Sequence, residues 1–495
     1  MRGVGAPEAG VARGTYTGKV RLHRGRVRLR VPEEGHHRAA SPLELFFDLV
    51  FVVAVAELTE VLLHAPTWAG VLRFGALYVP IWWAWVGYSF YADRFDNDDR
   101  IYRLIMIIAM MAVLSVSVAV PRAFTGTAGA KRFALGYFLV RLILLGLYLR
   151  AHYHVPRART LTRRFLQGYG LGAAIWGASA LLPTPYCYVL WGAGLLAELL
   201  TPILSASAVA RVPFNASHIP ERFGLFTIIV LGEVVALNAI GIAASGLRAE
   251  TMAVVAGSFL IAACQWWLVF DHVDPSPLRQ WRLTGQAYVY GHLFVHGGIT
   301  VTGVGGLLAA QAANARGHGH PALDGGSVLC FGMAVFLLGV GGIHLLNVGL
   351  GGDLRAWSRL GLAAAFTLIG LAGGGLPPLL LEAVLVCGLS CQILVETKAP
   401  AVPHTLHTPR PLHTRRAAPD NPGPALPPLP EPPGSRQRRG PIRPDRRAPA
   451  PADGACAPRG PPAPDNESAQ VVRVGTRTRP KAGSPRPQAA RTTAP

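Results

Sequence analysis

Long apolar stretches recur along the chain between residues 43 and 396, separated by short polar connections. A membrane-spanning helix needs about 20 mostly apolar residues, and by that criterion the pattern predicts about twelve spans. The predicted spans are 43–63, 68–91, 101–120, 131–150, 165–182, 185–207, 223–244, 250–271, 285–309, 327–348, 358–374 and 376–397. The predicted fold class is an all-α polytopic membrane protein whose surroundings are the lipid bilayer.

The segments on either side of the apolar region have a different composition. Residues 1–42 contain nine Lys and Arg against three acidic residues, and residues 399–495 are rich in Pro, Arg, Ala and Gly. A segment that buries so little apolar surface cannot offset its chain entropy, so the second of these is expected to be disordered. The predicted organisation is a basic N-terminal segment (1–42), a transmembrane domain (43–398) and a disordered Pro/Arg-rich tail (399–495).

The net charge of +20 lies mostly in these two terminal segments, and only 15% of all residues are charged. A nucleic-acid partner is therefore not indicated. Lys and Arg also concentrate in the connections that follow the even-numbered spans, and positive charge marks the cytoplasmic side of a membrane. The pattern predicts that both termini are cytoplasmic.

The first span carries four carboxylates, Glu44, Asp48, Glu57 and Glu60. Each costs about 2.5–3.5 kcal/mol at the centre of a membrane helix, so this helix is expected to face a polar interior. Asp48 and Glu57 are candidates for a proton or cation path. Two other interpretations remain open: Asp48 as a structural hydrogen-bonding residue, and Glu44 as a partner of the helix dipole at the headgroup level.

Three motifs resemble one bacterial family. They are LELFFDLVFVVAVAEL in the first span, WWAWVGYSFYADRFDNDD around residues 82–99, and HIPERFGLFTIIVLGE at 218–233. Together they resemble the low temperature requirement protein A (LtrA) family over roughly residues 38–398. The resemblance implies a multi-pass protein of the bacterial cytoplasmic (inner) membrane, linked to growth in the cold. It implies no substrate or reaction.

Further candidates follow from charged residues in apolar spans. Glu233 lies near the middle of span 223–244 and is a candidate for the same path. The candidate gate residues at its mouth are Glu44, His218, Glu221 and Arg222. Glu221 and Arg222 are alternatively read as a helix cap. Arg141 lies deep in span 131–150 and needs a buried carboxylate. The candidate partners are Glu57, Glu198 and Glu233. The pair is read either as structural or as part of a transport site.

Other polar residues support weaker interpretations. His292 and His296 share one helix face, which suits polar packing, a proton relay or, least well, a metal. The acids of 93–99 lack the residue spacing of a calcium loop. They are expected instead to contact the neighbouring Arg94, Arg100 and Arg103. Since no phosphate-binding loop is present, no cofactor is expected. Similar placement of acids and Trp pairs (Trp82-Trp83, Trp266-Trp267) in the two halves suggests a parallel repeat of six plus six spans.

The sequence thus favours a secondary transporter or an ion- or proton-conducting protein that moves protons or a small ion or solute. Its path residues would be Asp48, Glu57, Arg141 and Glu233. A membrane-embedded enzyme acting on lipid, with His292 and His296 in its site, and a non-catalytic membrane scaffold or sensor are the alternatives. Catalysis is the less favoured interpretation because no catalytic motif is present.

Overall fold

Long helices account for nearly all of the residues that the computed structural model describes, which are 27–30, 40–96, 99–212, 218–245, 248–273, 283–314, 323–348, 354–372 and 376–398. The first half contains α1 (Pro42–His64), α2 (Trp68–Arg94), α3 (Arg100–Ala119), α4 (Thr127–His154), α5 (Arg159–Ser179), α6 (Tyr186–Leu204) and the short α7 (Ala206–Ala210). The second half contains α8 (His218–Ser245), α9 (Ala249–His272), α10 (Leu283–Asn314), α11 (Gly325–Val348), α12 (Leu354–Ala372) and α13 (Pro378–Lys398). The prediction of a disordered tail falls outside the described residues.

Each predicted span coincides with one of the long helices. Nine of the helices described are both long and apolar enough to cross a membrane. The other three long helices, α1, α5 and α12, carry several charged residues: four carboxylates in α1 and arginines in the first turns of α5 and α12. The chain is therefore a helical membrane protein.

Polar caps define where several helices begin. The Ser41 side chain accepts a hydrogen bond from the Glu44 N–H, and the Glu44 side chain accepts one from the Ser41 N–H, which is a capping box at the start of α1. Thr67 caps α2 and Asp99 caps α3 in the same way, through one side-chain oxygen each. These caps satisfy amide groups that have no partner within their helices.

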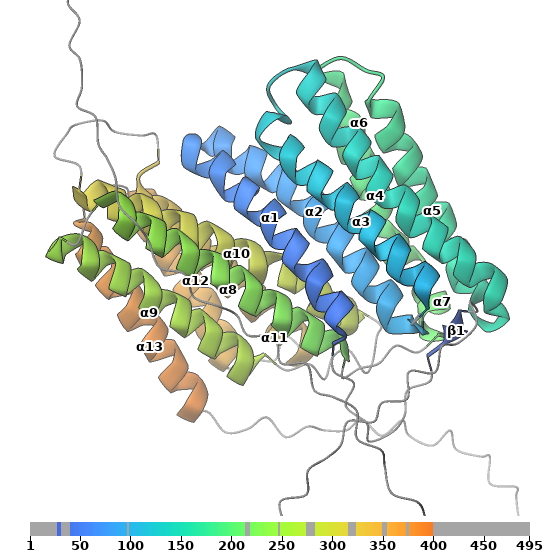
Figure 1. Cartoon of the computed structure of the whole chain (residues 1–495). Coiled ribbons are helices and arrows are strands. Elements are labelled where there is room, and N and C mark those ends of the chain that lie inside the picture. Colours follow the sequence, from blue (N-terminus) through green and yellow to red (C-terminus); the bar gives the residue numbers. More distant parts are fainter. Residues whose placement is uncertain are drawn as a thin grey trace, which may run out of the picture. The chain divides into compact units, whose positions relative to one another are not determined.

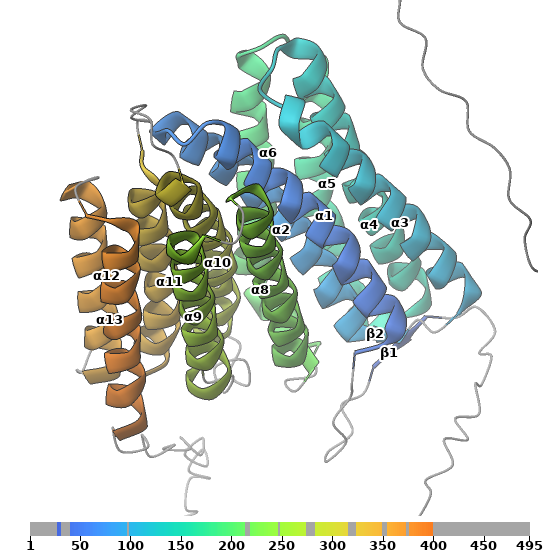
Figure 2. The same ribbon diagram turned by 60° about the vertical axis from the view of Figure 1, so that its left-hand side comes forward.

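The helices form two neighbouring groups, α1–α6 and α8–α13 (Figures 1 and 2). Helix α2 is rich in buried aromatic residues and lies where the groups meet. The Tyr78 hydroxyl donates to the carbonyl of Leu293 in α10 at 2.9 Å, and the Trp85 ring stacks on Phe226 of α8 with centroids 4.2 Å apart. This boundary brings polar residues of α1, α2 and α8 together.

A two-stranded antiparallel ladder lies outside the helices. Strand β1 (Arg28–Leu29) pairs with β2 (Phe95–Asp96), with Leu29 opposite Phe95. The predicted N-terminal segment therefore contributes an ordered strand that packs on the connection between α2 and α3. Val27 is buried beside it.

The two Trp pairs that suggested a repeat have different environments. Trp82 and Trp83 are each only 1% exposed, whereas Trp266 and Trp267 are 45% and 48% exposed. These side chains do not occupy equivalent positions in the two groups. The repeat stays a prediction.

Candidate polar site between α1, α2 and α8

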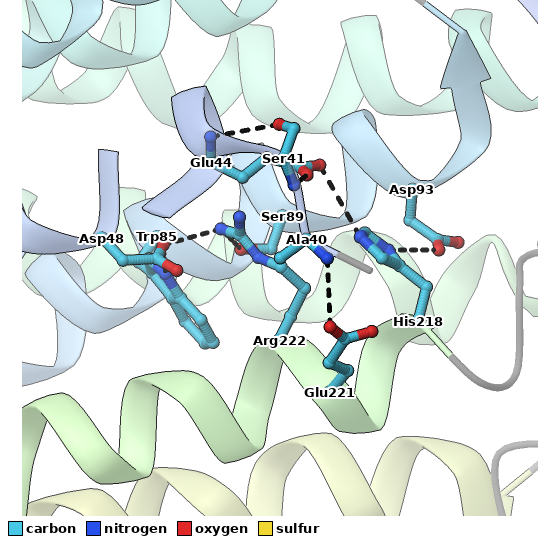
Figure 3. A network of polar contacts seen from close by, with 10 residues as sticks. All are labelled: Ala40, Ser41, Glu44, Asp48, Trp85, Ser89, Asp93, His218, Glu221 and Arg222. Atoms are coloured by element: carbon cyan, nitrogen blue, oxygen red, sulfur yellow. Dashed lines mark hydrogen bonds and ion pairs between the residues drawn. The ribbon is translucent and has the colours of Figure 1, made fainter. Parts of the chain in front are cut away.

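A buried ion pair joins the two groups of helices. The Arg222 guanidinium of α8 donates from Nη2 to Asp48 Oδ1 of α1 at 2.7 Å and to Ser89 Oγ of α2 at 3.1 Å (Figure 3). The Trp85 indole of α2 donates to the same Asp48 oxygen at 2.8 Å. Asp48 and Arg222 are 0% and 1% exposed. Asp48 thus has one charged and one neutral donor in a site away from solvent.

Helical spacing explains why these side chains converge. Glu44 and Asp48 are four residues apart on α1, as are His218 and Arg222 on α8. Residues at that spacing lie on one face of a helix, one turn apart. On α2 the series Trp85, Ser89 and Asp93 continues this spacing over two turns. Three helices therefore present polar stripes to a common axis.

A second set of contacts lies one turn nearer the helix ends. His218 Nδ1 is 3.0 Å from Asp93 Oδ1, and His218 Nε2 is 3.7 Å from Glu44 Oε1. Glu221 Oε1 accepts a hydrogen bond from the Ala40 N–H at 3.0 Å. Figure 3 shows His218 between the two carboxylates, with Glu221 directed towards the chain that precedes α1.

The buried charges of this network are mostly acidic. Three of its buried side chains are carboxylates (Glu44, Asp48 and Asp93), and Arg222 is the permanent cation among the residues drawn in Figure 3. His218 lies between two of these carboxylates, Glu44 and Asp93.

The central pair does not use all of its hydrogen-bonding capacity. Asp48 Oδ2 and the Arg222 Nε and Nη1 atoms are buried without a hydrogen-bond partner within the described residues. Buried polar atoms are normally paired with protein or ordered water. The pair thus has unused polar atoms that suit a proton, water or a small polar ligand.

The carboxylates Glu57 and Glu233 lie apart from this network. At 1.5 Å rise per residue, Glu57 is about 13 Å beyond Asp48 along α1, and Glu233 is about 16 Å beyond Arg222 along α8. Both are partly buried, and Glu60 lies near enough to Glu233 to interact with it electrostatically. Glu233 therefore has the acidic neighbour Glu60, and Glu57, nine residues after Asp48, lies on the opposite face of α1 from Asp48.

Arg141 belongs to a separate cluster. Its Nη2 lies 2.5 Å from Glu198 Oε2 of α6, and both side chains are fully buried. The Tyr137 hydroxyl donates to Glu198 at 2.7 Å and accepts from Arg141 Nε at 3.0 Å, so it bridges the pair. The prediction of a buried carboxylate partner is confirmed for Glu198, and the candidates Glu57 and Glu233 were wrong because Arg141 on α4 pairs with α6 and not with α1 or α8. This cluster lies within α1–α6, and Arg141 Nη1 and Glu198 Oε1 are buried without a hydrogen-bond partner within the described residues.

Comparison with known proteins places the chain in a family. The family model for the bacterial low temperature requirement A protein (LtrA) matches residues 39–394. The chain belongs to the LtrA family. A relative in Rhizobium meliloti (strain 1021), the uncharacterized protein RA0937, is 29% identical over 299 residues, which cover 56% of this chain and 71% of that protein. No solved structure matches the chain.

The motifs that carried the resemblance to the LtrA family form the network of Figure 3. Asp48 comes from the first motif, Trp85, Ser89 and Asp93 from the second, and His218 and Arg222 from the third. The sequence indicated each motif separately. Their meeting at one site is a finding of the structure.

The histidines of α10 are hydrogen-bonded to α2 and α8 and within α10 itself. His296 Nδ1 accepts from the Trp82 indole at 3.0 Å, and His296 Nε2 lies 2.9 Å from the Thr227 hydroxyl. His292 Nδ1 is hydrogen-bonded to the Tyr288 carbonyl at 2.8 Å. Among the residues described, no group of three His, Cys, Asp or Glu has the placement of a metal site.

Two acids at the end of α2 contact cations from other helices. Asp93 contacts His218, and Asp99 pairs with Arg150 at the end of α4. The predicted contacts of the acids of 93–99 with Arg94, Arg100 and Arg103 stay a prediction, because residues 97 and 98 lie outside the described residues.

Sequence reasoning missed two buried polar clusters in the second group. Glu382 of α13 is 1% exposed and accepts from the Ser258 hydroxyl of α9 at 2.6 Å. Arg359 of α12 donates to both carboxylate oxygens of Glu396 in α13, at 2.6 and 2.7 Å. A lone carboxylate in an apolar span was the available signal for these clusters. The same kind of signal had indicated Glu233.

Proposed function

We propose that this LtrA protein is a secondary transporter or an ion- or proton-conducting protein of the bacterial cytoplasmic membrane. The observation that carries the proposal is the buried, incompletely hydrogen-bonded Asp48–Arg222 pair at the boundary between two groups of helices. Transporters commonly place their sites between two halves that move against each other. Charged residues inside a membrane generally mark ion or substrate pathways.

The proposed path runs along the shared boundary of α1 and α8. Glu57 and Glu233 form its deep level, and Asp48 with Arg222 forms its level nearer the helix ends. His218, Glu44 and Glu221 act as the gate, because His218 holds two carboxylates from different helices. Arg141 stabilises α4 and α6 beside this path and lies outside it.

The proposed topology has twelve spans, including the three charged helices α1, α5 and α12. Both termini and the Pro/Arg-rich tail are then cytoplasmic, and the two groups of helices correspond to a parallel repeat. Charged helices are compatible with a membrane when their polar faces are covered by neighbouring helices. Reporter fusions at the N-terminus and after residue 398 should both give a cytoplasmic signal, and a periplasmic signal from either would contradict this topology.

Flux through reconstituted vesicles tests the proposed activity. In vesicles that contain the wild-type protein, an imposed proton or cation gradient should drive a measurable change in the internal pH or cation content. Glu233→Gln should remove that flux at unchanged protein level. Glu250→Gln is the matched control, because Glu250 is an exposed carboxylate at the start of α9. Normal flux in Glu233→Gln would remove this carboxylate from the path.

The same preparations distinguish the alternatives. An enzyme acting on lipid would give no flux and would change the lipid composition of the vesicles, whereas a scaffold would give no flux and leave the lipid composition unchanged. Complementation of a deletion strain in the cold connects the result to growth. Full rescue of growth in the cold by Glu233→Gln, at the same protein level as the wild type, would favour the scaffold.

A further inference from the structure

A wide basic groove lies where α4 ends and α5 begins, away from the network of Figure 3. Its volume is about 920 Å³. Three arginines of α5 line it, Arg159, Arg163 and Arg164, and no carboxylate does. The remaining wall includes Leu149 and Tyr153 of α4.

The arginines of this groove are available for an external anion. All three are exposed, and Arg163 and Arg164 make no hydrogen bond or ion pair within the described residues. Arg159 Nε points to the His152 carbonyl at 3.4 Å, which keeps its side chain against α4. Helix α5 also begins without a side-chain cap, so the positive end of its dipole adds to the same field.

The apolar wall sets the type of anion. Leu149 is 45% and Tyr153 is 68% exposed, one turn apart near the end of the membrane-spanning α4. Tyrosine is enriched where the hydrocarbon core meets the headgroups. The groove therefore offers apolar contacts on its membrane side and guanidinium groups beyond them.

We propose that this groove binds an anionic phospholipid. The headgroup phosphate contacts Arg159, Arg163 and Arg164, and one acyl chain lies along Leu149 and Tyr153. Basic pockets at the ends of membrane helices are suited to anionic headgroups. A soluble phosphate compound would leave the exposed leucine and tyrosine unused.

Binding of defined lipids to the purified full-length protein tests this proposal. Native mass spectrometry should show phosphatidylglycerol bound in preference to phosphatidylcholine with the same acyl chains. In Arg159→Gln/Arg163→Gln/Arg164→Gln the affinity for phosphatidylglycerol should fall about tenfold or more, since each basic residue near an anionic surface contributes separately. Binding of phosphatidylcholine should not change.

A control pair lies at the other end of α4. Arg122 and Arg132 line a separate groove there, and Arg122→Gln/Arg132→Gln should bind phosphatidylglycerol like the wild type. If the triple variant does not fold, Arg163→Gln alone should still weaken binding. Unchanged binding in the arginine variants, or equal competition by inorganic phosphate, would overturn the proposal.

Discussion

Asp48 and Arg222 are 174 residues apart in the chain, yet a 2.7 Å hydrogen bond joins them across the boundary between the two groups of helices. Replacing Arg222 with Leu leaves a buried carboxylate whose remaining donor is the indole of Trp85. Breaking a buried pair from one side costs about 3–5 kcal/mol. The melting temperature of Arg222→Leu in detergent should fall clearly, while Arg100→Leu, at an exposed site, should melt like the wild type.

Neutralising both members of this pair should be less damaging. Asp48→Asn/Arg222→Gln keeps hydrogen-bonding groups in place without leaving either charge alone. Its melting temperature should lie between those of Arg222→Leu and the wild type. A double variant as unstable as Arg222→Leu would show that shape, and not charge balance, dominates this site.

Arg141 should tolerate replacement only together with Glu198. The pair is fully buried, so Arg141→Ala leaves an uncompensated carboxylate and should lower the unfolding free energy by about 3–5 kcal/mol. Arg141→Leu/Glu198→Leu should recover much of that loss, because both charges are removed. Arg132→Leu, at an exposed site on the same helix, should have little effect on the thermal denaturation curve.

Asp99 should make stability depend on acid pH. Partial burial opposes its ionisation, but hydrogen bonds from Arg150 and from the Tyr102 N–H outweigh this and lower the pKa of Asp99 below its ordinary value of 3.8. The folded state therefore favours the ionised form. Its stabilising contribution is complete above the ordinary pKa and is lost as the pH falls through the lowered one.

The measurement compares wild type and Asp99→Asn across pH. A hydrogen bond to a charged group contributes about 1.5–3 kcal/mol, so Asp99→Asn should melt earlier than the wild type at pH 7. The difference should shrink towards pH 3. A difference in melting temperature that does not depend on pH would show that the charge of Asp99 does not stabilise the contact between the start of α3 and the end of α4.

Glu382 should accept an amide in place of its carboxyl group. Ser258 donates to Oε1, and Oε2 has no hydrogen-bond partner within the described residues. Glu382→Gln retains the acceptor and the size and should melt near the wild type. Glu382→Ala leaves the Ser258 hydroxyl without this acceptor, at a cost of about 1–3 kcal/mol. Equal losses in both variants would mean that the ionised carboxylate itself is required.

The positions of the helices were predictable from the sequence because apolar runs and caps are local signals. The need of Arg141 for a carboxylate was also predictable, since it follows from burial alone. Its choice of Glu198 was not, because that depends on how α4 and α6 pack. Likewise Asp48 and Arg222 were each recognised as unusual, but a single sequence carries no signal that pairs two residues on helices so far apart.

Asp93 shows the same limit for a contact between distant helices. Its sequence neighbours are arginines, and a local reading does not reveal its contact with α8. In the structure its side chain continues the α2 stripe of Trp85 and Ser89 and reaches His218 of α8. Helical spacing on α2 was the signal that would have separated Asp93 from the rest of the loop.

The hydrogen bond from the Ala40 N–H to Glu221 has a mechanical consequence. It ties the residue two positions before α1 to the first turn of α8. The next residue, Ser41, is held to α1 by its capping box with Glu44. If α8 rotates or slides against α1, this hydrogen bond must break or Ala40 must move with α8. The residues directly before α1 therefore restrict the relative motion of the two groups of helices.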